Sequence, residues 1–225
     1  KGKPPSNPTL NREVRCLTRL LRWAVDRGLL PNSPLQGIKM LPETPARMPT
    51  LDIETESRIL AILPAWARLP VKIALYTGAR AGEILQARWR DFDLEQGLWT
   101  IPDSKNLCPR TVPLNGELVE VLTPLQGLPE AHVVTLNGHS VPVQSLSQTF
   151  RRAVRRIGRP DLRFHDLRHV FASRLLAQGA SLPEIAALLG HKTLSISARY
   201  SHASLTRLRV LCDALVTRTR RISDK

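Results

Sequence analysis

The sequence predicts a mainly helical protein with a small antiparallel β-sheet, the α+β class. Apolar residues recur every three or four positions along most of the 225 residues, and 42% of the chain is hydrophobic, enough for one ordinary core. Two short β-type runs, Leu98–Ile101 and Arg110–Leu114, enclose a polar turn and predict one hairpin. Gly158, Gly179 and Gly190 mark the expected ends of successive helices.

The first expected element is an amphipathic helix over residues 9–28, which ends near Gly28. Its apolar residues follow helical spacing: Leu10, Val14, Leu17, Leu21 and Ala24. Prolines at 42, 45 and 49 then predict a linker. A single helix cannot bury its own apolar face, so this helix either packs on the main body or is the tail of a truncated first domain. We favour the truncated domain, with residues 1–45 separate from 46–225.

The second body is expected to begin with a capped helix. Thr50–Asp52 precedes acidic residues at 54 and 56, a pattern typical of a helix start, and this helix is expected to run to about Leu63. The apolar run Val71–Tyr76 follows, is interrupted at Thr77–Arg80, and continues as helix through Glu83–Gln86. Beyond the hairpin, further helices are expected near residues 115–127, 145–157, 165–178, 182–189 and 203–219.

The charge of the chain predicts a polyanionic partner. Its lysines and arginines number 33 against 19 acidic residues, which gives a formal net charge of +14 and a pI near 10.9. Most of these cations are arginines, whose planar guanidinium suits bidentate contacts with phosphate. The alternative is a basic surface without a function of its own.

The cysteines and the apolar stretches of the chain indicate the cellular compartment to expect. Cys16, Cys108 and Cys212 are odd in number and far apart, which argues against a disulfide framework or a zinc knuckle and fits a reducing bacterial cytoplasm or nucleoid. No apolar stretch reaches the roughly 18 residues of a membrane span. The first residues lack the apolar region of a signal peptide. We therefore expect neither a membrane segment nor export.

The residues that precede Tyr200 suggest chemistry on phosphate. A phenol has a pKa near 10, so only about 0.1% is ionised at neutral pH, and it becomes a useful nucleophile only among cationic or basic groups. His165 and Arg168 share a helix face because they are three residues apart, and His191 follows a glycine that ends the next helix. A separate apolar stripe on the same helix is expected to face the core: Leu167, Phe171 and Leu175.

Two upstream residues add positive charge. Arg80 lies at a glycine-containing turn before a helix, where backbone amides attract phosphate, and Lys105 lies at the expected hairpin tip. Singly, each candidate has an ordinary alternative: a structural histidine, a solvated lysine, or a surface ion pair between Arg80 and Glu83. The stretch His165–His169 also imitates the zinc motif H-E-x-x-H. Because Arg168 would repel a dication and no third ligand is evident, we expect no metal and no cofactor.

The order of these residues resembles the tyrosine recombinase (phage integrase) family over about residues 50–210. Five stretches carry the resemblance: Tyr76–Ile84; Ser104–Asn106 with Arg110–Leu114; His165–His169; Leu189–His191; and Tyr200–His202. The helix at 9–28 also looks like the last helix of the family's core-binding domain. On this resemblance, residues 1–45 are the C-terminal remnant of that DNA-binding domain with its linker, and residues 46–225 are the catalytic domain. Ala79 and Ala81 replace bulkier or hydroxyl side chains of many relatives.

The resemblance implies a reaction and a set of residues that perform it. The reaction is site-specific recombination or integration of double-stranded DNA through a 3′-phosphotyrosyl intermediate. The implied catalytic residues are Tyr200 as nucleophile with Arg80, Lys105, His165, Arg168 and His191. The arginines would bind non-bridging phosphate oxygens and the lysine would protonate the leaving 5′ oxygen. His165 is favoured as the base, although spacing does not divide the acid and base roles.

Three questions stay open on the sequence. A type IB topoisomerase-like enzyme uses a similar residue set, and a DNA-binding protein with an inactive pocket is a further alternative. The resemblance implies a tetramer on paired DNA sites that is weakly associated or monomeric without DNA. The apolar stripe of the last helix either packs on its own chain or docks onto a neighbouring protomer; it comprises Leu205, Leu208, Leu211 or Cys212, and Leu215.

Overall fold

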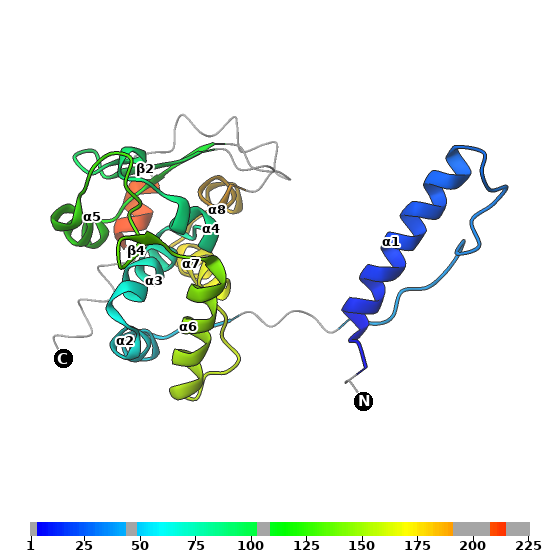
Figure 1. The fold of residues 1–225 in the computed structure, drawn as a ribbon, viewed down its shortest axis with the longest axis horizontal. Coiled ribbons are helices and arrows are strands. Elements are labelled where there is room, and N and C mark those ends of the chain that lie inside the picture. Colours follow the sequence, from blue (N-terminus) through cyan, green and yellow to red (C-terminus); the bar gives the residue numbers. More distant parts are fainter. Residues whose placement is uncertain (1–3, 44–48, 103–108, 191–207, 215–225) are drawn as a thin grey trace. The chain divides into compact units, whose positions relative to one another are not determined.

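The computed structural model describes residues 4–43, 49–102, 109–190 and 208–214, and the chain divides into two units, Lys1–Arg47 and Met48–Lys225. The first unit holds helix α1 (Asn7–Asp26), close to the expected 9–28 (Figure 1). Asn11 is buried there because its side chain accepts from the Leu41 amide at 2.8 Å and donates to the Leu41 carbonyl at 2.9 Å. These bonds hold the returning chain beside α1, and Leu20 and Trp23 of this helix are exposed.

The second unit opens with three helices that lead to the site. Helix α2 (Ile53–Ile62) has the predicted start, since the Asp52 carboxylate accepts from the Thr55 amide at 2.6 Å. Helix α3 (Ala65–Thr77) begins six residues before the expected apolar run and contains Pro70. Helix α4 (Ala81–Gln86) follows a sharp turn.

The β-structure is larger than the single predicted hairpin. Strands β2 (Leu98–Ile101) and β3 (Arg110–Pro113) pair antiparallel as expected, and a third strand, β1 (Phe92–Asp93), adds to β2 after the short helix η1 (Trp89–Asp91). A second sheet joins β4 (Thr135–Leu136) to β5 (His139–Ser140). The expectation of one sheet is therefore wrong, because strands of two residues exist only through their pairing and have no local periodicity.

The remaining elements follow the predicted order. They are α5 (Gly116–Leu122), η2 (Thr123–Leu125), α6 (Val143–Arg156), α7 (Asp166–Ala177), α8 (Leu182–Leu189) and a helical stretch over 208–214. Gly190 ends α8 in the left-handed conformation, with φ 67°, as its position suggested. Within the described residues, no helix combines the length and apolar character needed to cross a membrane.

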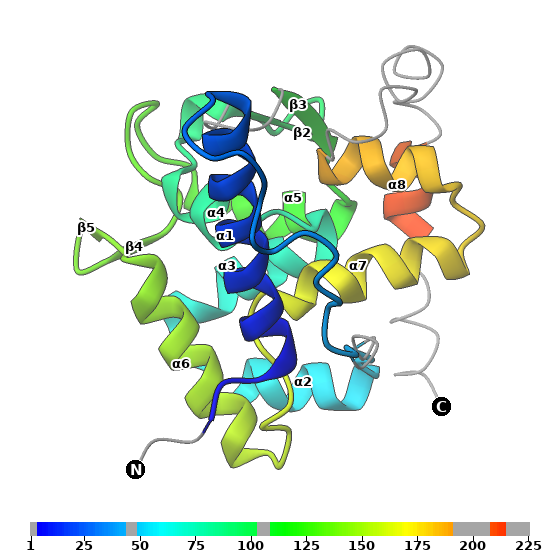
Figure 2. The ribbon, with the colours of Figure 1, turned by 90° about the vertical axis from the view of Figure 1, so that its right-hand side faces the viewer.

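The core of the second unit is built around α3. This helix packs against α4, α5, α6 and α7, and Figures 1 and 2 show α7 running beside it. Tyr76 is buried, as are the three residues of the predicted α7 stripe: Leu167, Phe171 and Leu175. The carboxyl end of α3 and the amino end of α7 therefore meet inside one packed body, and both carry candidate site residues.

The helical stretch at 208–214 packs within its own chain. Leu208, Leu211 and Cys212 are buried in the core of the second unit, and Arg209 donates to the Gln96 carbonyl. The structure thus favours the first of the two alternatives for this stripe. Leu205 and Leu215 lie outside the described residues.

Candidate active site

Three of the six predicted site residues lie in the described part of the chain. Arg80, His165 and Arg168 come from the α3–α4 turn and the start of α7, which are more than 80 residues apart in sequence. The other three, Lys105, His191 and Tyr200, lie outside the described residues.

The turn that carries Arg80 depends on Gly78. This glycine has φ 65°, and a Cβ added there would lie 2.5 Å from a Phe171 side-chain carbon and 2.6 Å from one of Leu189. The Thr77 hydroxyl fixes the same turn, since it donates to the Ile73 carbonyl at 2.6 Å and accepts from the Ala79 amide at 3.2 Å. The chain can therefore reverse tightly against α7 and α8.

Glu83 orients Arg80 from one turn along α4. Its carboxylate accepts from the Arg80 backbone amide at 2.8 Å and from the Arg80 guanidinium at 3.2 Å. The sequence left open that Arg80 only forms an ion pair with Glu83, and this ion pair is present. It uses a single guanidinium nitrogen, and 35% of the Arg80 side chain remains exposed. Part of this cation is therefore free to meet a ligand.

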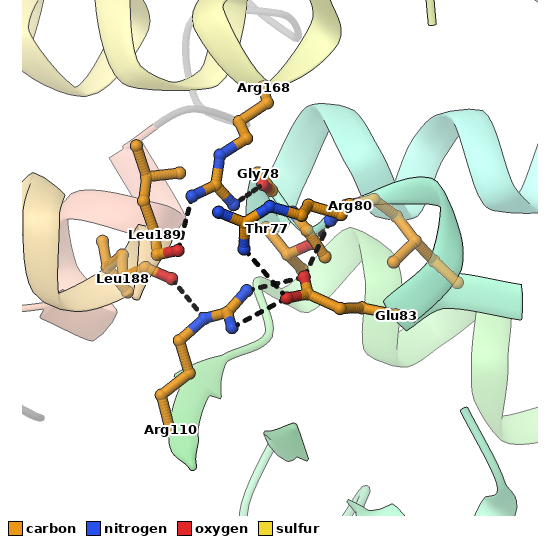
Figure 3. Close-up of polar contacts among 10 residues, drawn as sticks. Thr77, Gly78, Arg80, Glu83, Arg110, Arg168, Leu188 and Leu189 are labelled. Carbon is orange, nitrogen blue, oxygen red and sulfur yellow. Dashed lines mark hydrogen bonds and ion pairs between the residues drawn. The ribbon is translucent and has the colours of Figure 1, made fainter. Parts of the chain in front are cut away.

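Arg168 is buried, so α7 does not present it on an open cationic face as expected. Only 4% of the residue is exposed, and its guanidinium donates to the Gly78 carbonyl at 2.8 Å and to the Leu189 carbonyl at 2.5 Å (Figure 3). Burial, together with the charges of Arg80 and Arg110, lowers the pKa of Arg168 to about 10. The group still carries its charge at neutral pH, and its hydrogen-bond partners among the described residues are both neutral carbonyls.

The two guanidinium groups form a concentration of positive charge. Figure 3 shows the guanidinium groups of Arg80 and Arg168 near the turn at Gly78, whose carbonyl accepts from Arg168, and the charge of Arg80 contributes to the lowered pKa of Arg168. A pocket of about 450 Å³ opens on the side of Arg80 that faces Glu83, Gln86 and Trp99; Arg168 and His165 are not among its lining residues. Like charges held together by the fold are costly, and a bound anion relieves that cost.

His165 is suited to accept a proton. It lies at the amino end of α7, is exposed, and makes an edge-to-face contact with His169, with ring centroids 5.7 Å apart. Partial burial lowers the pKa of His165 below its ordinary value, and the charges of His169, Arg168 and Arg80 act in the same direction. The imidazole is therefore neutral at physiological pH. Within the described ranges, His165 and His169 have no third partner with which to form a metal site.

Sequence reasoning missed the part played by Arg110. Its guanidinium donates to both Glu83 oxygens, at 3.1 and 2.8 Å, and to the Leu188 carbonyl at 2.9 Å. The sequence does contain a signal. Arg110 and Val112 are two residues apart in β3, so they share one face of the strand, and Val112 is fully buried. Strand periodicity alone could have indicated that this arginine points inward.

Comparison with known proteins assigns the chain to a family. The family model described as "Phage integrase family" matches the sequence over residues 50–207, well over half of the chain. The chain belongs to the phage integrase family, the tyrosine recombinases. The match includes the positions of Arg80, Lys105, His165, Arg168, His191 and Tyr200.

Named members of the phage integrase family cover nearly the whole chain. The shufflon-specific DNA recombinase of Escherichia coli is 30% identical over 99% of this chain and 58% of its own length. A tyrosine recombinase XerC-like protein of Caldanaerobacter subterraneus is 28% identical over 88% of this chain and 63% of its own. The chain thus spans about three fifths of the length of these relatives.

The fold agrees with that of solved integrases. A chain from the lambda integrase tetramer bound to a Holliday junction superposes with a TM-score of 0.64 at 22% identity, covering 80% of this chain and 57% of that one. The mainly helical architecture with small antiparallel sheets is therefore that of a tyrosine recombinase catalytic domain.

Proposed function

We propose that this chain is the catalytic part of a site-specific DNA recombinase, which cleaves and rejoins strands through a 3′-phosphotyrosyl bond. The observation that carries the proposal is the pair of guanidinium groups of Arg80 and Arg168, held together by separate elements. A phosphodiester has two non-bridging oxygens whose charge must be met as it is attacked, and this pair supplies two cationic donors.

Side chains of this chain can supply the nucleophile and both proton transfers of the cleavage step. Tyr200 Oη forms a bond to phosphorus as the bond from phosphorus to the 5′ oxygen breaks. The phenolic proton passes to His165, which is neutral at physiological pH, and Lys105 protonates the departing 5′ oxygen. His191 supports the phosphate. Rejoining is the reverse, with a 5′ hydroxyl displacing Tyr200, so the covalent bond conserves the energy of the cut strand.

The partner of this reaction is double-stranded DNA. Helix α6 presents exposed arginines, and the chain has a net charge of +14. Both features favour binding to the phosphate backbone of DNA. The named relatives are recombinases, and the lambda integrase chain compared above was solved as a tetramer on a Holliday junction. We extend this to a tetramer of the present protein on paired sites, acting in the bacterial cytoplasm or nucleoid, with residues 1–45 as the end of its core-binding domain.

Covalent capture tests the proposal. A pool of nicked duplexes of random sequence is incubated with wild-type protein and with Tyr200→Phe, and the nick releases a short strand so that any adduct accumulates. We expect a denaturation-resistant protein–DNA band with wild type and none with Tyr200→Phe, and the captured DNA reveals the site. Absence of adduct from wild type over the whole pool would refute the reaction class. Relaxation of plasmids without strand exchange would point to a topoisomerase.

A further inference from the structure

Arg110 and Glu83 form the most deeply buried ion pair among those of the described residues. Each side chain is only 7% exposed, and the two groups meet in a bidentate arrangement with N–O distances of 3.1 and 2.8 Å. Such fork-to-carboxylate pairs are the strongest and most directional that arginine makes. The pair therefore fixes the carboxylate of Glu83 in one orientation.

The same carboxylate is shared with Arg80 (Figure 3). One oxygen of Glu83 accepts from the side chains of both arginines, and the other accepts from Arg110 and from the Arg80 backbone amide. Arg110 has two contacts with Glu83, whereas the Arg80 side chain has one at 3.2 Å. The negative charge of Glu83 is thus taken up chiefly by Arg110.

This sharing decides how much charge Arg80 has left for a phosphate. In the absence of Arg110, Glu83 would face a single cation, and a buried carboxylate without another partner pairs with whatever cation it reaches. The Arg80 guanidinium would then be the main partner of the Glu83 carboxylate and would be less available to a phosphate. With Arg110 in place, Glu83 still orients the Arg80 backbone but competes less for its guanidinium.

Arg110 also supports the end of α8. It donates to the Leu188 carbonyl at 2.9 Å, while Arg168 donates to the next carbonyl, that of Leu189. Gly190 lies directly against Arg110, because a Cβ there would be 3.0 Å from two atoms of its side chain. The arginine therefore contacts both α4 and α8.

We propose that Arg110 is a positioning residue that takes up the charge of Glu83, so that the guanidinium of Arg80 stays available to the phosphate. The inference rests on the proposed function for its catalytic consequence. Its electrostatic part holds for any phosphate bound by Arg80.

The first test is the rate of covalent capture at saturating DNA. Arg110→Met removes the charge while retaining an unbranched apolar side chain. We expect the first-order rate to fall about 10- to 100-fold, less than the roughly 10²- to 10³-fold typical when a direct transition-state donor is lost. Glu83→Gln in the Arg110→Met background removes the competing charge and is expected to recover about tenfold of that loss. If Arg110 were only structural, Arg110→Met would lower the unfolding free energy but keep the wild-type first-order rate of the folded, DNA-bound protein.

Arg174→Met is the matched control. Arg174 also donates to a buried glutamate, Glu56 at 2.6 Å, and to a backbone carbonyl, that of Leu51 at 3.1 Å, but none of these residues contacts Arg80. We expect it to lose stability as Arg110→Met does and to keep the wild-type rate. Should Arg110→Met fail to fold, Arg110→Lys replaces it, with Arg110→Lys/Glu83→Gln expected to be the faster of the two.

Inorganic phosphate provides a readout that does not need catalysis. Side-chain NMR of Arg80 reports phosphate binding in wild type, Arg110→Met and the double variant, and we expect affinity about tenfold weaker in the single variant and partly restored in the double. Equal phosphate affinity in all three would overturn the inference. Failure of wild type to form any adduct, with the phosphate ranking preserved, would instead contradict only the proposed reaction.

Discussion

Arg80 and Arg168 bring similar groups to the site but differ in what their removal leaves behind. Arg80→Ala removes a partly exposed cation, so we expect the capture rate to fall by about two to three decades with little change in unfolding free energy. Arg168→Ala leaves the buried carbonyls of Gly78 and Leu189 without their donor, which is expected to cost about 2–5 kcal/mol of stability as well. Urea unfolding alongside capture kinetics measures both. Equal stability of the two variants would contradict the burial argument.

His165 gives the reaction a dependence on pH. Its pKa lies below 6.5, through burial first and then the charge of His169, so it remains a free base as pH falls to that value. The capture rate should therefore decline only below about pH 6.5 in wild type. His169→Ala removes a neighbouring charge and is expected to move this acidic limb to higher pH. An unmoved limb would mean that another group limits the rate.

The same shift affects stability. A histidine whose folded pKa is lowered favours the neutral form, so its contribution is present above the unfolded value and is lost as pH falls toward the folded pKa. Glu83 behaves in the corresponding way for a carboxyl: burial opposes ionisation, but bonds from Arg110 and Arg80 outweigh it and lower its pKa. Its contribution is lost only in stronger acid.

The α3–α4 turn is the element on which the position of Arg80 depends. Gly78→Ala would place a methyl group 2.5 Å from Phe171 and 2.6 Å from Leu189 in a left-handed conformation, and we expect a loss of about 1–3 kcal/mol or more. Gly82→Ala is the control, because its added Cβ meets nothing within 4 Å and the residue is helical. Thermal unfolding should separate the two; similar melting temperatures would show that α7 and α8 can yield at this turn.

Elements with local signals were predictable, and those that depend on distant partners were not. The α2 start could be read from Asp52 because its cap lies within four residues. The first turns of α3 could not, because Pro70 lies inside the helix, where a proline removes a backbone donor and argues locally against helix. Strand β1 and the β4–β5 pair have no period to detect.

The residues of the site also divide into features that the sequence indicates and features that depend on distant partners. The positions of Arg80, His165 and Arg168 followed from motif order, but the burial of Arg168 depends on carbonyls 90 and 21 residues away in sequence. The bond between Arg110 and Glu83 spans 27 residues and joins a strand to a helix. Spacing along one element carries no information on such pairs.

At the scale of the whole molecule, charge predicts how DNA binding responds to salt. The logarithm of affinity should fall with the logarithm of salt concentration by about 0.9 for each phosphate neutralised. Arg155→Ala on α6 is expected to reduce this slope by about one, whereas Arg88→Ala, whose cation is already paired with Glu130, leaves it unchanged. Gel shifts over a salt series measure it. An unchanged slope for Arg155→Ala would contradict this prediction.

The bonds from Arg110 and Arg168 to consecutive carbonyls have a consequence for the field at the site. Leu188 and Leu189 end α8, and the carboxyl end of a helix carries about half a unit of negative charge from its aligned peptide dipoles. That end would repel the phosphate. Two guanidinium groups bonded to it offset this partial charge, so the helix macrodipole no longer opposes the approach of DNA.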